Sequence, residues 1–162
     1  MGQIKVRAAA VLNARPEDVY ATIADYRKGH PHILPKGSLY DLHVEQGGYG
    51  AGTTIRFKAR ALGVEQSFYQ RVSEPEPGKV LVEQDINSVH NAVTTFTVTP
   101  LEQGQKSHVE ISHTENASPG LQGFIEGVVT PIVLPPVLRK ELKLLEAVAQ
   151  KRGTPLATSK QN

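Results

Sequence analysis

The side chains best suited to acid–base chemistry lie late in the strand-rich part of the chain. His113 and Glu115 are two residues apart, so in a strand both project from the same face. A carboxylate next to an imidazole fixes its tautomer and makes the histidine a candidate general base. We therefore predict His113 and Glu115 as catalytic or ligand-orienting residues. The alternative is a hydrogen-bonded strand histidine beside a solvated glutamate at a strand end.

Two further polar residues are expected near this pair. When the segments 92–99 and 108–115 pair as a hairpin around the turn at Gly104, Thr94 lies opposite His113. The same hairpin brings His90 to the end of the face that carries Glu115. Buried or half-buried polar groups of this kind need hydrogen-bond partners, which a ligand can supply.

Other site chemistries find little support in the sequence. The chain has no cysteine, which excludes disulfides, thiolate metal sites and thiol nucleophiles. His30 and His32 flank a proline in a loop, and with His43 they match no known metal-ligand spacing. The glycines of segment 47–52 lack the lysine and the following helix of a phosphate-binding loop. We therefore expect no metal and no cofactor.

The composition is that of one globular domain. The chain has 162 residues, 39% of them hydrophobic, and a formal net charge of +2, which gives no reason to expect nucleic-acid binding. The first residues lack the apolar core that a signal peptide has, and no apolar run approaches the roughly 18 residues of a membrane span. We expect a cytoplasmic monomer or homodimer without integral membrane association.

The elements that position these residues follow from hydrophobic periodicity. The segment 3–12 alternates as a half-buried strand, and Pro16 opens a short helix with acidic residues in its first turn. The segment 28–37 contains two prolines and two glycines, which predicts a loop or one short second helix. Six more strand-like segments then follow in a meander, at 39–45, 53–61, 64–73, 79–86, 92–99 and 108–115.

A long amphipathic helix is predicted over 118–152. Its apolar residues repeat at a helical period, and Pro131, Pro135 and Pro136 are expected to cause a kink or a short break. Only this helix is long enough to cover a seven-stranded sheet. We therefore predict an α+β fold in which a curved antiparallel sheet wraps around the C-terminal helix, with the domain over 1–152 and a flexible tail over 153–162.

The register of the hairpins assigns residues to the face turned toward this helix. A two-residue turn at Leu62 and Gly63 pairs Phe57 with Phe68 and Arg60 with Glu65. We carry the same phase into the strand 79–86, which places Val80, Val82 and Gln84 on the inner face. The residues predicted to contact a ligand from this face, the long helix and the mouth of the pocket are Tyr26, Phe57, Phe68, Gln70, Gln84, His90, Thr94, Phe96, Phe124 and Val128.

Several local segments are typical of one superfamily when they occur in this order. They are ARPEDVYATIAD at 14–25, PHILP at 31–35, GGYGAGT at 47–53, EPEPG at 74–78 and TTFTV at 94–98. Over about residues 3–151 the chain resembles the START-like (SRPBCC) superfamily with its helix-grip fold, and most of all its bacterial polyketide cyclase/dehydratase-like branch. The resemblance implies a hydrophobic cavity that holds a lipid, sterol, polyketide or aromatic metabolite. It does not imply catalysis, because the matching segments are turns, caps and packing residues.

Three functions remain open on the sequence alone. The first is carriage or sensing of a hydrophobic small molecule in a cavity between the sheet and the C-terminal helix. The second is an enzyme of the polyketide cyclase/dehydratase kind, in which His113 moves protons together with Glu115 or Tyr26. The third is an accessory domain that binds a protein partner through the helix or the loop at His30.

Overall fold

The structure is a computed structural model that describes residues 2–153. Two helices, two short 3-10 turns and seven strands follow one another along the chain. They are β1 (Gln3–Leu12), α1 (Pro16–Ala24), η1 (His30–His32), β2 (Leu39–Gln46), β3 (Thr54–Ala61), β4 (Val64–Glu76), β5 (Val80–Asp85), β6 (Val93–Leu101), η2 (Glu102–Gly104), β7 (Lys106–Asn116) and α2 (Gly120–Gly153). The predicted order of elements is confirmed. Gly153, predicted as the first residue of the tail over 153–162, is instead the last residue of α2, and the rest of that tail lies outside the described residues.

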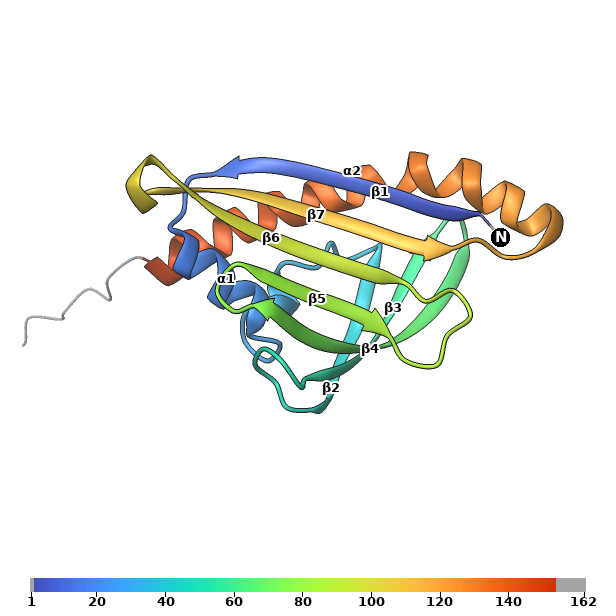
Figure 1. Ribbon diagram of the computed structural model, residues 1–162, viewed down its shortest axis with the longest axis horizontal. Helices are drawn as coiled ribbons and strands as arrows, with labels where there is room; N and C mark the ends of the chain where they lie inside the picture. Colours follow the sequence, from blue (N-terminus) through green and yellow to red (C-terminus); the bar gives the residue numbers. More distant parts are fainter. Residues whose placement is uncertain (1, 154–162) are drawn as a thin grey trace, which may run out of the picture.

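The seven strands form one antiparallel sheet in the order β1-β7-β6-β5-β4-β3-β2, which curves around α2 (Figure 1). Both predicted hairpin registers are confirmed. Phe57 pairs with Phe68 across β3 and β4, and Thr94 pairs with His113 across β6 and β7. Cα partners in such a ladder share a face, so the registers also define which side chains point toward α2.

One end of the space between the sheet and α2 is closed by α1 and the second half of α2. Pro16 occupies the first turn of α1, where its missing N–H has no partner to lose, and the acidic Glu17 and Asp18 lie at the positive end of the helix dipole. Val19 and Ile23 of α1 are fully buried in the hydrophobic core. In the loop after α1, only the 3-10 turn η1 takes the place of the possible second helix.

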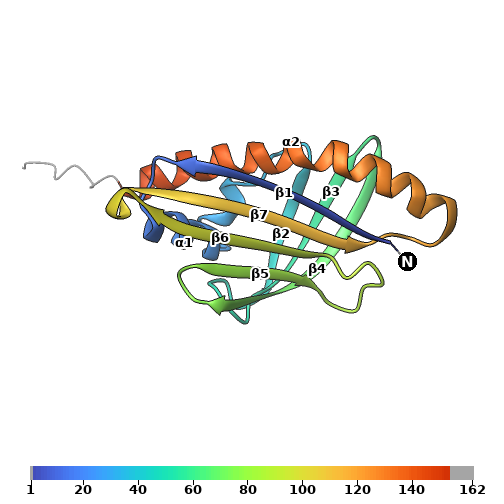
Figure 2. The same ribbon diagram turned by 45° about the horizontal axis from the view of Figure 1, so that its top comes forward.

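The two halves of α2 differ in their packing (Figure 2). In the second half, the residues that repeat along one face are buried: Leu138, Leu142, Leu145 and Ala149. In the first half, the described side chains are exposed or half-buried apart from Gly123, and large apolar residues are in contact with solvent: Leu121, Phe124, Ile125, Val128 and Ile132. The helix runs from Gly120 to Gly153 without the break that its three prolines led us to consider.

Part of α2 is long and apolar enough to cross a membrane, which the sequence analysis did not anticipate. Length and composition alone also select the core helices of soluble proteins. The second half of α2 packs against the sheet and α1 within the hydrophobic core. The apolar window itself is 11% buried, so we interpret only the second half of α2 as the core part of this helix.

The inner face of β5 is where the sequence-based assignment is wrong. Leu81 pairs with the inward-facing Phe96, so Leu81 and Glu83 point toward α2, while Val80, Val82 and Gln84 point away from it. The segment Val80–Val82 is apolar at three consecutive positions and gives no alternation from which to read a phase. A register shift between Ser73 and Glu76 also prevents the phase of β4 from carrying over.

Candidate functional site

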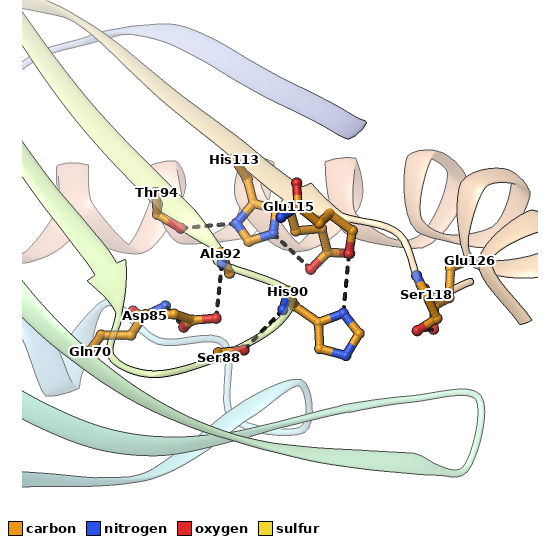
Figure 3. Close-up of polar contacts among 11 residues, drawn as sticks. Gln70, Asp85, Ser88, His90, Ala92, Thr94, His113, Glu115, Ser118 and Glu126 are labelled. Atoms are coloured by element: carbon orange, nitrogen blue, oxygen red, sulfur yellow. Dashed lines mark hydrogen bonds and ion pairs between the residues drawn. The ribbon is translucent and has the colours of Figure 1, made fainter. Parts of the chain in front are cut away.

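Thr94, His113 and Glu115 form a chain of polar contacts on the inner face of the sheet (Figure 3). The Nε2 atom of His113 lies 3.3 Å from Oε2 of Glu115, and its Nδ1 atom lies 3.0 Å from Oγ1 of Thr94. The side chains of His113 and Glu115 are 12% and 15% exposed, so both remain within reach of a ligand. The structure thus brings together the pair predicted as catalytic, with Thr94 as the partner expected from the hairpin register.

His90 lies at the same end of the face, as predicted. Its ring Nδ1 is 3.1 Å from the carbonyl oxygen of Asn116, the residue after Glu115. Its own backbone carbonyl accepts a hydrogen bond from the Asn116 N–H, and its backbone N–H donates to Ser88. These bonds fasten the β5–β6 loop to the end of β7. His90 contacts the backbone beside the His113–Glu115 pair rather than the two side chains themselves.

Gln70 lies deeper on the same face and is fully buried. Its Nε2 donates to Oδ1 of Asp85 at 2.9 Å, and the other Asp85 oxygen accepts the backbone N–H of Ala92. Among the described residues the Oε1 atom of Gln70 has no hydrogen-bond partner. A buried acceptor without a donor costs free energy, so Gln70 marks a region of the inner face that is short of donors.

The start of α2 is held beside this end of the sheet by Glu126. Its carboxylate accepts the backbone N–H and the hydroxyl of Ser118, each at 2.8 Å. Partial burial alone would raise the pKa of Glu126, but the hydrogen bonds from Ser118 and Gln122 and the nearby His90 lower it overall. The carboxylate therefore anchors the first turns of α2 in its ionised form.

Apolar side chains line the open part of the fold. The rings of Phe57 and Phe68 stack with their centroids 4.9 Å apart and stay half-buried on the inner face. Phe124 and Val128 line an open groove of about 690 Å³ between the start of β1 and the first half of α2. Two glycines leave room on the helix side of this groove, Gly120 and Gly127, while Gly123 packs directly against the Ser118 backbone. These four predicted ligand contacts therefore present apolar surface that other side chains leave open.

A second histidine–glutamate pair occupies the closed end of the fold. The Tyr26 hydroxyl donates to Oε1 of Glu83 at 2.6 Å, and the Nε2 atom of His30 lies 3.5 Å from the same oxygen. The ring of His30 stacks on Tyr26, and its Nδ1 is 2.8 Å from the carbonyl oxygen of Ile23. All three side chains are buried. This cluster joins α1, η1 and β5 inside the core.

Glu141 of α2 completes the buried cluster. Burial and the nearby charge of Glu83 raise the pKa of Glu141 well above the ordinary carboxyl value, which keeps this side chain protonated. Burial, with the adjacent Glu83, likewise raises the pKa of the Tyr26 hydroxyl. Two carboxyl groups therefore share a core region, and the raised pKa keeps the one on Glu141 protonated.

Three predicted ligand contacts lie elsewhere than expected. Tyr26 does not line a pocket mouth, because its ring is buried and its hydroxyl is bound to Glu83. Phe96 faces inward as predicted, but it is 1% exposed and packs edge-on against His30 in the core. Gln84 is exposed on the opposite face of the sheet, where it donates to Asn91.

The buried cluster was missed by sequence reasoning, although one of its members carries a readable signal. The phase error in β5 placed Glu83 on the outer face, so its partners were not considered. Glu141, in contrast, carries a readable signal. It lies three residues after Leu138 and four before Leu145, within the apolar stripe of α2. A carboxylate in such a stripe indicates a buried acid that needs a partner.

Within residues 2–153, no group of three or more His, Asp or Glu side chains is arranged to hold a metal ion. His30 belongs to the buried cluster, whereas His32 is exposed on the same 3-10 turn and His43 lies in β2. Of the two proline-linked histidines, His30 therefore packs in the closed end, whereas His32 is exposed.

Comparisons with known proteins agree with this architecture. The NMR solution structure of KanY protein matches with a TM-score of 0.78 and 28% identity, over 93% of this chain and 99% of that one. The Zhui aromatase/cyclase from Streptomyces sp. R1128 matches with a TM-score of 0.76 and 14% identity, over 94% and 97% of the two chains. A START superfamily protein from Mycobacterium smegmatis matches with a TM-score of 0.68 and 13% identity, over 93% and 98%.

No curated protein sequence matches the chain. Residues 3–150 match the family described as polyketide cyclase/dehydrase and lipid transport, which confirms the resemblance inferred from the local segments. The structural neighbours share the START-like fold, in which a sheet grips a long C-terminal helix. Since the match covers nearly all of its length, the chain belongs to the polyketide cyclase/dehydrase and lipid transport family.

Proposed function

We propose that this protein binds a hydrophobic small molecule, as a carrier or sensor, between the open part of the sheet and the first half of α2. The observation that carries the proposal is the uncovered apolar surface at this end. Phe57 and Phe68 are only half-buried, and Phe124 and Val128 face an open groove of about 690 Å³. Ligand sites for small molecules have volumes of roughly 300–1,000 Å³. Family membership supports a hydrophobic ligand-binding role for the same fold.

The polar groups of the site are few and grouped. We assign Thr94, His113 and Glu115 to the polar end of the proposed site, and the aromatic pair and the first half of α2 to its apolar walls. The groove itself is lined by the start of β1, the segment before α2 and the first half of α2. Mostly apolar sites with a small number of fixed polar groups bind through burial and use the polar groups for orientation. In this proposal His113 and Thr94 orient the ligand, and Phe124 and Val128 close over it.

A charge placed in the groove tests the proposal. Val128→Arg is expected to abolish co-purification of any apolar ligand detected by native mass spectrometry, because an arginine in the groove opposes apolar binding. Val11→Arg is the matched control, since Val11 and Val128 are 55% and 51% exposed and Val11 lies in β1 away from the groove. Far-ultraviolet circular dichroism checks that both variants fold. Equal ligand content in Val128→Arg and the control contradicts the proposal.

A second candidate function is proton transfer during polyketide cyclisation or dehydration. The contact chain from Glu115 through His113 to Thr94 favours it, because a carboxylate behind an imidazole supports a general base. His113→Ala should then lower turnover of a synthetic poly-β-ketone by roughly 10²–10⁴-fold with little loss of binding. His108→Ala is the control, since His108 lies in the same strand on the opposite face. Undiminished turnover in His113→Ala removes this function.

A further inference from the structure

The hydrogen positions around His113 follow from its two partners. An ionised Glu115 can only accept, so Nε2 of His113 carries the proton that points at Oε2. In the neutral imidazole Nδ1 is then an acceptor, and the Thr94 hydroxyl must donate to it. The Thr94 oxygen keeps its lone pairs for a ligand and has no hydrogen left to offer. At Thr94 the polar end of the site can therefore accept a hydrogen bond from a ligand but cannot donate one.

His90 repeats this pattern at the same end of the sheet. Its Nδ1 faces the carbonyl oxygen of Asn116, which accepts only, so Nδ1 carries the proton. In the neutral ring Nε2 then presents a lone pair. Deeper on the inner face, Oε1 of Gln70 is a further acceptor without a donor. Each of the three atoms, Thr94 Oγ1, His90 Nε2 and Gln70 Oε1, is therefore an acceptor that lacks a donor among the described residues.

The charged residues of the sheet are also unevenly distributed, with acidic side chains on the inner face and basic side chains on the outer face. The strand registers place Glu83, Asp85 and Glu115 on the inner face. No lysine or arginine from the strands within residues 2–153 shares that face. The cations of β3 lie on the outer face, where they pair with acids: Arg56 with Glu45, Lys58 with Asp41, and Arg60 with Glu65. Lys5 lines the open groove from the outer face of β1, but on the inner face around Thr94 the negative charge has no lysine or arginine of the described strands beside it and repels an anionic ligand.

We infer that the site selects uncharged apolar molecules that carry a hydroxyl group, and that Thr94 Oγ1 accepts the hydrogen bond from that hydroxyl. The inference rests on the proposed ligand-binding function and adds the chemical class of the ligand. A phenol, an enol or a sterol-like alcohol fits this class. A carboxylate or phosphate does not fit this class, because it adds further acceptors and negative charge to a face that already carries unpaired acceptors and acidic side chains.

A matched series of naphthalenes tests the inference. The probes are 2-naphthol, which has a hydroxyl donor, 2-methoxynaphthalene, which lacks it, and 2-naphthoate, which is anionic. Binding is measured by probe fluorescence, which meets no tryptophan background in this chain, at about pH 8, above the ordinary histidine range. We expect 2-naphthol to bind about tenfold more tightly than 2-methoxynaphthalene, as one hydrogen bond allows, and 2-naphthoate to bind most weakly.

The variant Thr94→Val removes the accepting oxygen at nearly constant volume and should reduce the 2-naphthol preference to near onefold. Thr95→Val is the control, because Thr95 is the next residue in β6 and faces the other side of the sheet. Equal binding of 2-naphthol and 2-methoxynaphthalene to the native protein overturns the inference and leaves the ligand-binding function intact. Tightest binding of 2-naphthoate, or a preference that survives in Thr94→Val, also overturns it. If none of the three probes binds, both the inference about the hydroxyl group and the proposed ligand-binding function are overturned.

Discussion

The two histidine–glutamate pairs of this protein lie close together on the inner face, because Glu83 and His113 both pair with Thr94 across neighbouring strands, and they differ in their surroundings. The side chains of His30 and Glu83 are 3% and 7% exposed, and they are enclosed by α1, η1 and the second half of α2. The side chains of His113 and Glu115 are 12% and 15% exposed. The same two residue types therefore serve a closed part and a more open part of one face.

The difference in burial between the two pairs indicates that His30 and Glu83 have a structural role and that His113 and Glu115 are available for a functional one. At the closed end each polar atom of the His30 ring already has a protein partner, and no surface remains for a ligand. At the open end the contact chain stops at the Thr94 oxygen, which keeps unused hydrogen-bonding capacity. Substitutions at the closed end should affect stability, and substitutions at the open end should affect ligand binding.

The largest expected contrast is between the two glutamates. Glu83→Ala removes the acceptor of the buried Tyr26 hydroxyl and the partner of His30, and should lower the free energy of unfolding by about 3–5 kcal/mol. Glu115→Ala should lower it by less than about 1 kcal/mol, because this pair is partly solvated. Urea unfolding followed by circular dichroism measures both. Equal losses for the two variants contradict a structural assignment of the closed end.

The two halves of α2 offer a second contrast. Leu145→Ala should cost about 2–5 kcal/mol, because Leu145 is fully buried and its truncation leaves a cavity. Leu121→Ala should change the free energy of unfolding by less than about 0.5 kcal/mol, since Leu121 is 76% exposed. The same urea experiment compares them. A loss above about 2 kcal/mol for Leu121→Ala means that the first half of α2 is packed in solution.

The smallest effect expected is a change in the pH dependence of stability caused by Glu141. The raised pKa means that the folded protein holds this proton more tightly than the unfolded chain. The stabilisation is therefore complete below the ordinary carboxyl range and is lost as pH rises toward the raised value, by at most about 1.4 kcal/mol per pH unit. Glu141→Gln should match the native protein near pH ~4 and exceed it in stability near pH ~8.

Thermal unfolding across this pH range measures the effect of Glu141→Gln. The control is Glu76→Gln, which removes an exposed carboxylate in β4 and should leave the shape of the pH profile unchanged. Parallel profiles for the native protein and Glu141→Gln mean that the two buried carboxyl groups do not share the core as described.

The sequence was informative where short turns fixed the strand register. Leu62 and Gly63 determine the β3–β4 pairing, and the turn at Gly104 likewise predicts Thr94 opposite His113. Reasoning failed in β5, where three consecutive apolar residues fit either face. That one-residue error assigned Gln84 to the inner face in place of Glu83, so the buried cluster around Glu83 was not predicted.

Burial depth was the other quantity beyond reach of the sequence. Periodicity correctly assigned Phe96, Phe57 and Phe124 to apolar positions, but the three rings lie in the core, in the half-open site and in the groove. Which stretch of a sheet is covered depends on where α1 and α2 cross it, and this is a property of tertiary packing. Local pattern carries no such information.

The prolines of α2 lie at the border between its two halves. Pro131 and Pro135 have no amide hydrogen, so the carbonyls of Gly127 and Pro131 lack the donor that an ordinary helix would supply four residues later. Pro136 deprives Ile132 of its donor in the same way. The helix therefore has its lowest bending stiffness next to the groove, and the two ends of the fold are joined by a mechanically soft segment.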